Sequence, residues 1–338
     1  MTDTTRLFPY FFPTTVVFVD DNPKFLRSLA LELPEDLAYQ SFETAEAGLE
    51  RVNRSPATQP LWQRCFSQYG PEGASSEKLI HLDLTQIELE ISNRERFSEV
   101  SVVVVDFDMP VMDGLEFCRR IRDPRIRKVL FTGVADEKVA VQAFNAGIID
   151  RFIIKSQPDA VEAVRRAVIE LQQHYFEAIS ETLRATLMLD PPPFLTDPAV
   201  AGLFAELRRE KRLVEYYLVA GPGGFLCLTD DGELYRLVVL SEAELAAQAD
   251  WAERSGAPAT VVRALRDRER LGYFYETPDA FYAAEDYAWD EYLVPARRLD
   301  GERSWYYALI TAPPVDIDFD GEAAHYNAYL DRLDSDAA

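Results

Sequence analysis

Val102-Val103-Val104-Val105-Asp106 is the stretch of sequence that decides the fold. Four consecutive β-branched residues without polar alternation predict a parallel strand that is buried on both faces. Open α/β sheets place their functional side chains at the carboxyl ends of such strands, and this strand ends at Asp106. Pro110 and Gly114 then indicate a tight loop before an apolar-periodic helix at residues 115–121. The stretch therefore predicts a central strand that presents Asp106 at the functional edge of a sheet.

Strands and helices alternate throughout the first half of the chain. Five strands are predicted, over residues 14–19, 38–42, 102–106, 127–131 and 152–154. Residues 53–97 are too long for an ordinary connection, so they predict an insertion with helical pieces at about 61–69 and 84–96. Strands that alternate with helices in this way specify a parallel sheet with right-handed crossovers, which is an α/β fold.

The second half of the chain follows a different pattern. The helix that begins near Asp159 keeps apolar residues at spacings of three and four until the prolines at 191–193 end it. Such a helix suits a signalling stalk, a dimer seam, or a long helix that lies on its own second domain. Short strands, glycine-rich turns and two helices then predict an α+β domain on an antiparallel sheet of five or six strands. The predicted organisation is a first domain at 14–175, a helical linker at 176–193, an α+β output domain at 194–315 and an acidic, frayed tail at 316–338.

Charge and composition exclude several classes of protein. The net charge is −23, and residues 190–338 contain 14 basic and 29 acidic residues, which argues against binding to nucleic acid. No apolar run approaches the length of a membrane span, and the aromatic residues 8–13 lack the basic flank of a signal peptide. We therefore expect a cytoplasmic protein without membrane association. The scattered cysteines and histidines predict neither a disulfide framework nor a zinc site.

Acidic residues follow two of the predicted strands. Asp20 and Asp21 come directly after the strand at 14–19, and Asp106 ends the central strand. Three carboxylates at one edge of a sheet cannot all remain ionised without a cation, and oxygen ligands at an open site suit Mg²⁺. Thr132 and Lys155 end the next two strands and add a hydroxyl and an ammonium. An aspartate, a divalent ion, a hydroxyl and a lysine are the groups needed to accept a phosphoryl group.

These residues, in this order, resemble the receiver domain of two-component response regulators. The matching elements are Asp20-Asp21, Asp106, Met109-Pro110, Met112-Asp113-Gly114, Thr132 and Lys155. The resemblance covers residues 14 to about 175 and implies a flavodoxin-like fold. It also implies that Asp106 is phosphorylated by a sensor histidine kinase or a phosphotransfer protein.

The resemblance assigns a role to each residue of the site. Thr132 and Lys155 would grip the phosphoryl group on Asp106, and Phe152 would be the aromatic switch residue that moves with Thr132. Mg²⁺ would bind the side chains of Asp20, Asp21 and Asp106 and the backbone carbonyl of Asp108. Phosphorylation would change the face formed by the last helices, which leads us to expect a homodimer through these helices and the linker, or domain release.

Three positions depart from the family pattern. Ser156 follows Lys155 where proline is usual, Gly133 follows Thr132 where alanine is commoner, and Asp108 adds a carboxylate beside Asp106. We hypothesise that Asp108 and Gly133 together set the lifetime of the phosphoaspartate, by positioning or repelling water.

Two alternatives remain open at this point. Asp106-Phe107-Asp108 also resembles the opening of haloacid-dehalogenase-type phosphatases, but the metal-binding acid pair of that family follows the lysine, whereas Asp20-Asp21 precedes it here. Asp230-Asp231-Gly232 is interpreted as a hairpin turn. The output domain carries no enzyme signature in residues 190–338, so a protein- or ligand-binding module is favoured over an enzymatic output. Its aromatic residues are interpreted mainly as core and cross-strand pairs; they are Tyr216, Tyr217, Tyr273, Tyr275, Trp289, Trp305, Tyr306 and Tyr307.

Overall fold

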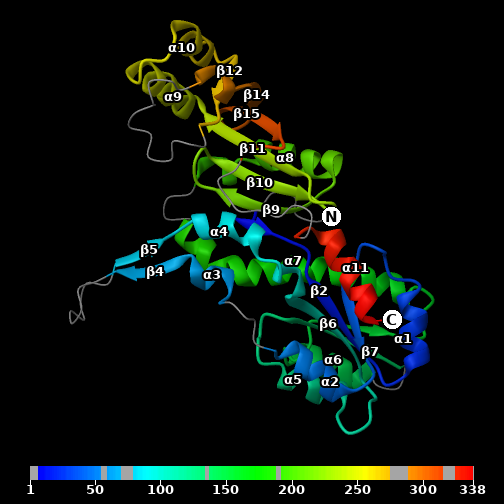
Figure 1. Cartoon of the computed structure of the whole chain (residues 1–338). Coiled ribbons are helices and arrows are strands. Elements are labelled where there is room, and N and C mark those ends of the chain that lie inside the picture. The colour runs from blue at the N-terminus through cyan, green and yellow to red at the C-terminus, as the bar shows by residue number, and fades with distance from the viewer. Residues whose placement is uncertain are drawn as a thin grey trace. The chain divides into compact units, whose positions relative to one another are not determined.

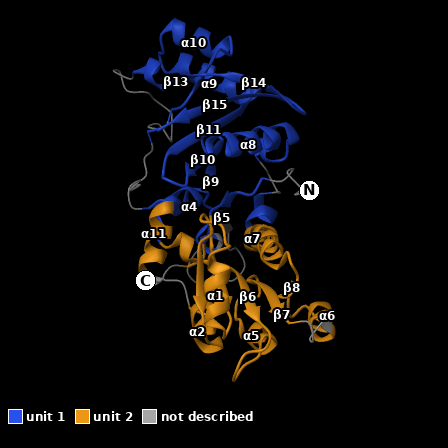
Figure 2. Ribbon diagram, turned by 90° about the vertical axis from the view of Figure 1, so that its right-hand side faces the viewer, with its two compact units in different colours: residues 1–12, 61–94, 182–326 blue, residues 13–60, 95–181, 327–338 orange. Residues whose placement is uncertain are grey.

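The chain folds into two compact units, each assembled from three separate segments. The computed structural model describes residues 7–54, 59–69, 79–133, 137–187, 192–274, 288–314 and 324–337. The parallel-sheet unit contains residues 13–60, 95–181 and 327–338, drawn in orange in Figure 2. The antiparallel-sheet unit contains residues 1–12, 61–94 and 182–326. This division differs from the predicted organisation, in which residues 53–97 are an insertion and the two domains otherwise follow one another along the chain.

The parallel-sheet unit is built on five strands in the order β3-β2-β6-β7-β8. Their bounds are Tyr39–Phe42 for β3, Thr15–Val19 for β2, Val100–Asp106 for β6, Arg127–Thr132 for β7 and Arg151–Ile154 for β8. All four pairings are parallel, and every residue of β2 and β6 is buried. The valine runs predicted such strands, and the flavodoxin-like α/β fold is confirmed.

Helices cover both faces of this sheet (Figure 1). On one face, α1 (Pro23–Ala30) and α7 (Ala160–Leu187) bury Leu26, Leu29, Val164 and Val168 against β2, β6, β7 and β8. On the other, α2 (Ala45–Val52) packs against β2 and α5 (Gly114–Arg120). Asn22 begins α1 because its side chain accepts hydrogen bonds from the amides of Lys24 and Phe25. Gly147 follows the α6 helix (Glu137–Asn145), and its φ of +68° is typical of a glycine that ends a helix.

The insertion after α2 is largely part of the other unit. The predicted helix at 61–69 is wrong in its second half, because only Leu61–Arg64 forms a helix, α3. The residues after it form β4 (Phe66–Tyr69), which pairs with the unpredicted β5 (Leu79–Leu82). Cross-strand pairing with β5 overrides the local helical preference there. The second predicted helix is α4 (Thr85–Leu89), followed by 3₁₀ turns at Glu90–Ser92 and Arg96–Ser98.

The antiparallel-sheet unit has a six-stranded sheet in the order β1-β9-β10-β11-β15-β14. The bounds are Tyr10–Phe11 for β1, Leu213–Val219 for β9, Gly224–Thr229 for β10, Leu234–Ser241 for β11, Ser304–Thr311 for β15 and Arg297–Asp300 for β14. The strand β12 (Arg270–Gly272) pairs separately with β13 (Leu293–Pro295). The expected antiparallel sheet is confirmed, and the aromatic segment near the beginning of the chain adds an edge strand that the sequence did not predict.

Helices also cover both faces of the antiparallel sheet. On α8 (Pro198–Lys211), Phe204 contacts the rings of Tyr216 and Phe225. On the opposite face, α9 (Glu242–Arg254) and α10 (Ala259–Arg266) share a core with β11 and β15. The predicted aromatic core is confirmed at six positions, all at most 7% exposed: Tyr216, Tyr217, Tyr273, Trp289, Trp305 and Tyr306. Tyr307 is half-buried, and Tyr275 lies outside the described residues.

The described part of the predicted tail is helical rather than frayed. A helix, α11 (Tyr326–Ala337), lies within the predicted tail, and its residues from 327 belong to the parallel-sheet unit. The Tyr329 hydroxyl lies 2.6 Å from Oγ1 of Thr15, and its ring centroid lies 5.8 Å from that of Phe97. Burial of these groups stabilises the packed helix, although the segment is rich in acidic residues. Among the helices that the structure describes, none is both long and apolar enough to span a bilayer.

Candidate functional site

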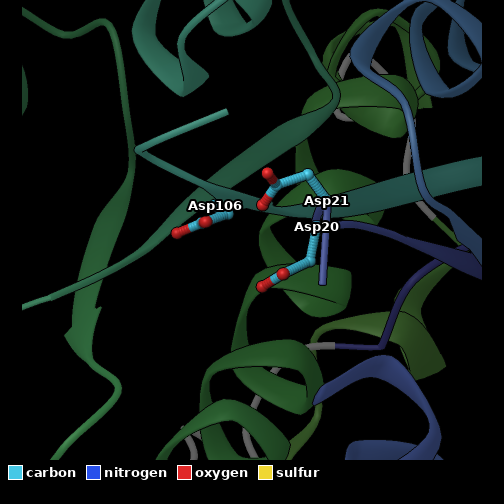
Figure 3. A group of neighbouring side chains, drawn as sticks. All are labelled: Asp20, Asp21 and Asp106. Carbon is cyan, nitrogen blue, oxygen red and sulfur yellow. The ribbon is translucent and has the colours of Figure 1, made fainter. Parts of the chain in front are cut away.

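The carboxyl ends of β2 and β6 bring three aspartates together. Val19 pairs with Val105, so Asp20 and Asp106 occupy neighbouring positions at one edge of the sheet. Carboxylate oxygens of Asp20, Asp21 and Asp106 lie within 4.8 Å of one another (Figure 3). Asp20 is 3% and Asp106 8% exposed, whereas Asp21 faces solvent. The predicted meeting of these carboxylates is therefore a feature of the structure.

Lys155 connects two of these carboxylates. Its Nζ lies 2.5 Å from Oδ2 of Asp20 and 2.8 Å from Oδ1 of Asp106. The backbone fixes the start of this side chain, since the Lys155 amide donates to the carbonyl oxygen of Thr132 over 2.8 Å. The ammonium therefore neutralises part of the negative charge that the aspartates concentrate at this edge.

The environment of Asp20 opposes its ionisation. Burial raises the pKa of the Asp20 carboxyl, and the neighbouring Asp106 carboxylate adds to this effect. Hydrogen bonds from Lys155 and from the backbone amide of Asn22, the latter 2.9 Å long, act in the opposite direction. A buried carboxylate with a raised pKa gains from a cation that binds directly to it.

The three carboxylates fit a divalent metal ion. They are hard oxygen donors, two are buried, and Asp21 leaves the group open to solvent, which suits an ion such as Mg²⁺ that retains bound water. Asp108, whose backbone carbonyl is the fourth predicted ligand, is exposed in the loop after β6. Its role as a ligand stays a prediction.

The loop between β6 and α5 requires a glycine at its end. A Cβ atom on Gly114 would lie 2.3 Å from the backbone oxygen of Asp106, so glycine allows the helix to start directly behind the acidic edge. The Gly114 amide donates to the carbonyl oxygen of Phe107 over 3.0 Å, and Asp113 caps α5 by accepting from the Glu116 amide. Val111 has a φ of +69° and is 96% exposed, which is a strained conformation for a β-branched residue.

Thr132 and Phe152 lie on the strands next to the acidic group. Asp106 pairs with Phe131, so Thr132 lies at the same edge of the sheet. Thr132 is fully buried, and its hydroxyl donates to the carbonyl oxygen of Gly133 over 3.4 Å. Phe152 is half-buried on β8, where it pairs with Leu130. The assigned roles of Thr132 and Phe152 stay predictions.

The sequence did not reveal the aromatic neighbours of Lys155. Its Nζ lies 4.7 Å from the ring centroid of Phe25 and 5.8 Å from that of Phe131. Phe25 belongs to the apolar stripe of α1, and such a stripe predicts only a core position. A lysine at a strand end and an aromatic residue on the first helix give no local signal that they meet.

Comparisons with known proteins agree with this geometry. A family profile for the response regulator receiver domain matches residues 77–165. The solved structure of the Legionella pneumophila response regulator LqsR is 36% identical, covers 98% of both chains and superposes with a TM-score of 0.76. The cyclic di-GMP phosphodiesterase response regulator RpfG of Xanthomonas campestris is 37% identical over 78 residues, and the transcriptional regulatory protein FixJ of Rhizobium meliloti is 41% identical over 70.

The latter two matches are partial. They cover 22% and 20% of this chain, and the chain spans only 21% of RpfG and 34% of FixJ. The profile match begins at residue 77 and so leaves out Asp20 and Asp21, which precede the insertion.

The match to LqsR over nearly the whole chain decides between a response regulator and the phosphatase alternative. Asp230-Asp231-Gly232, the other acidic pair, lies between β10 and β11 in the antiparallel-sheet unit, with Gly232 at a φ of +88°. The phosphatase alternative is therefore rejected. This chain belongs to the response regulators of two-component signalling, with its receiver domain in the parallel-sheet unit.

Proposed function

We propose that Asp106 is the phosphoacceptor of this response regulator and that a sensor histidine kinase or a phosphotransfer protein is the donor. A carboxylate oxygen of Asp106 forms the new bond to phosphorus while the bond from phosphorus to the donor imidazole nitrogen breaks. The bonding electron pair returns to that nitrogen. The product is an acyl phosphate on Asp106 and an unmodified donor histidine.

The observation that carries this proposal is the position of Lys155 between Asp20 and Asp106. An ammonium 2.8 Å from the acceptor oxygen can bind a phosphoryl oxygen after a small movement. Thr132, at the same edge of the sheet, supplies a hydroxyl for a second phosphoryl oxygen. In this proposal Asp20, Asp21, Asp106 and the backbone carbonyl of Asp108 hold Mg²⁺, which would neutralise charge on the phosphoryl oxygens when bound.

The test uses acetyl phosphate or beryllofluoride with Mg²⁺. Intact mass after acetyl phosphate should show one added phosphoryl group on the wild type and none on Asp106→Asn. Beryllofluoride should raise the melting temperature of the wild type only. Equal labelling of both proteins would place the modification elsewhere and contradict the assignment of Asp106.

We further propose that Asp108 and Gly133 set how long the phosphoryl group survives. Both are exposed: Asp108 lies two residues after Asp106, and Gly133 directly follows Thr132. A carboxylate at 108 would orient or repel the water that hydrolyses the acyl phosphate. Phosphoaspartate decay should therefore change in Asp108→Asn and in Gly133→Ala, and unchanged decay in both would count against this role.

Phosphorylation is proposed to switch the face formed by α6, β8 and α7. The phosphoryl group adds nearly two negative charges, which would draw the Thr132 hydroxyl away from Gly133 and let Phe152 repack on β8. Apolar side chains are exposed on the two helices, with Val141 and Phe144 on α6 and Ile169 on α7 each at least 41% exposed. A homodimer through this face and the linker at 176–193 would bury them.

Light scattering distinguishes a homodimer formed through this face from release of the output domain. Beryllofluoride should double the mass of the wild type but not that of Phe144→Glu, while both proteins accept phosphate. Leu31→Glu is the matched control, because Leu31 is 88% exposed and lies directly after α1, on neither α6 nor α7. A wild type that stays monomeric would favour release of the output domain instead.

The antiparallel-sheet unit is proposed to be a protein- or ligand-binding output module. It contains a cavity of about 290 Å³, slightly below the usual size of small-molecule sites. The cavity is lined by Leu84, Pro192, Pro193, Phe194, Leu218, Val219, Ala220, Gly223 and Glu244. A fragment screen by thermal shift, with Ala220→Trp as the filled-cavity control, tests whether this space binds ligands. RpfG is named as a phosphodiesterase, but the match covers too little of RpfG to support an enzymatic output domain in this chain.

A further inference from the structure

Two phenylalanine rings lie close to the Lys155 ammonium, in addition to the carboxylates that it contacts. Phe25 of α1 presents its ring 4.7 Å from Nζ, and Phe131 of β7 lies 5.8 Å away. The two rings contact each other, with centroids 5.5 Å apart and planes at 56°. The ammonium therefore has two kinds of partner: the carboxylates of Asp20 and Asp106, and the faces of aromatic rings.

These two kinds of partner differ in what happens to them during the reaction. The carboxylates are the groups that would bind metal and phosphate, so their contacts with Lys155 must change when either arrives. The rings are uncharged and take no part in the chemistry, so their contact can persist throughout. A lysine side chain has four flexible bonds and high rotamer entropy, and a persistent contact restricts where its ammonium moves.

We propose that Phe25 is a positioning residue for phosphoryl transfer, which it assists by holding the Lys155 ammonium beside the acceptor carboxylate. This inference rests on the proposed function, because it concerns the rate at which Asp106 is phosphorylated. Phe131 provides the second ring near the ammonium. It is only 3% exposed within the core, so its substitution would also disturb the fold. Phe25 is only half-buried, which makes it the more informative residue to change.

The plain alternative is that Phe25 only packs against the core. It does contact the cluster that contains Phe131 and Leu29. Leucine at this position keeps apolar packing and removes the ring, whereas tyrosine keeps the ring. If Phe25 only packs in the core, each substitution should slow phosphorylation in proportion to the stability that it removes. If Phe25 positions Lys155, loss of the ring should slow phosphorylation even where stability is kept.

The first measurement uses metal-free protein and does not depend on activity. Lysine is rare in this chain, occurring at positions 24, 78, 128, 138, 155 and 211, so NMR of protein labelled at the lysine side chains is readily assigned. The Lys155 side-chain protons should be shifted upfield by the ring currents in the wild type and in Phe25→Tyr. The shift should fall in Phe25→Leu. An unchanged shift in Phe25→Leu would overturn the inference.

The second measurement is the rate of phosphorylation by acetyl phosphate. Phe25→Leu should react about three- to tenfold more slowly, which is the range expected from losing one cation–π contact, and Phe25→Tyr should be close to wild type. Tyr39→Leu is the matched control, because Tyr39, like Phe25, is half-buried against the same core cluster, and it begins β3 (Tyr39–Phe42) at the end of the sheet opposite to Lys155. It should react at the wild-type rate.

A double-mutant cycle makes the dependence on Lys155 explicit. If Phe25 acts through the ammonium, Phe25→Leu should slow the Lys155→Met background no further. An equal slowing in both backgrounds would show that Phe25 acts by packing alone. The two hypotheses also fail differently: a wild type that never labels contradicts the proposed function, whereas a wild type that labels no faster than Phe25→Leu contradicts only the role of Phe25.

Discussion

The Lys155 ammonium lies 2.8 Å from Oδ1 of Asp106, so the proposed acceptor carboxylate is paired with a cationic side chain of the same domain. The same ammonium contacts Asp20 at 2.5 Å. One positive charge is therefore shared by two buried carboxylates, and we expect this shared contact to affect both the stability and the chemistry of the site.

Removing the shared cation should destabilise the metal-free protein. In Lys155→Met the carboxylates of Asp20 and Asp106 remain close together and buried, and we expect the free energy of unfolding to fall by about 1–3 kcal/mol. Mg²⁺ should then stabilise the variant more than it stabilises the wild type, because the metal replaces the missing charge. Thermal unfolding with and without Mg²⁺ measures both effects, and an equal gain in the two proteins would contradict them.

The raised pKa of Asp20 predicts a specific dependence on pH. The folded protein binds this proton more tightly than the unfolded chain, whose ordinary value is 3.8. The resulting stability is complete below that value and is lost as pH rises through the higher folded-state pKa. Without metal, the melting temperature of the wild type should therefore fall relative to that of Asp20→Asn as pH rises from about 4 toward neutrality. A constant difference between the two proteins would show that Asp20 titrates normally.

The same substitution should affect the stability of the protein differently at two glycines of the site. Gly114→Ala places a Cβ 2.3 Å from the Asp106 backbone oxygen, so we expect a loss of about 2–3 kcal/mol and slower phosphorylation. Gly133→Ala meets no described atom within 4 Å, and its stability should stay within about 0.5 kcal/mol of wild type. Chemical denaturation of the two variants provides the comparison. Equal stability of both would mean that α5 moves away at no cost.

The final helix should stabilise the receiver domain. Thr15 donates its hydroxyl proton to the carbonyl oxygen of Phe97 over 2.8 Å, so the Tyr329 hydroxyl is the donor in its 2.6 Å contact with Thr15. Tyr329→Phe removes this buried hydrogen bond and should cost about 1–2 kcal/mol. Denaturant unfolding of the full chain measures the loss of stability. Amide hydrogen exchange in β2 then shows whether the loss occurs in the receiver domain. Unchanged exchange there would show that α11 contributes no stability to the receiver domain.

The receiver fold and its acidic group were predictable because their signals are local. The run at 102–105 identifies a buried strand without knowledge of its neighbours, and the ends of parallel strands must share an edge. Asp20, Asp106 and Lys155 therefore meet as expected. The hairpin β4–β5 was missed because cross-strand pairing, rather than local preference, makes residues 66–69 a strand.

Contacts between distant parts of the sequence account for the other misses. The residues of α11 look like a solvated tail because the partners of Tyr329, which are Thr15 and Phe97, lie far from it in the sequence. The pairing of β1 with β9 is missed for the same reason. Phe25 has an ordinary core spacing, and only the tertiary structure brings its ring to Lys155.

The identity of the phosphorylated residue tests the central claim most directly. After reaction with acetyl phosphate and Mg²⁺, borohydride reduction converts an aspartyl phosphate to homoserine, and peptide mass spectrometry locates it in the sequence. The account predicts homoserine at position 106 alone, and none in Lys155→Met treated for the same short time. Reduction at another aspartate, or no homoserine in a folded wild type with Mg²⁺ present, would contradict it.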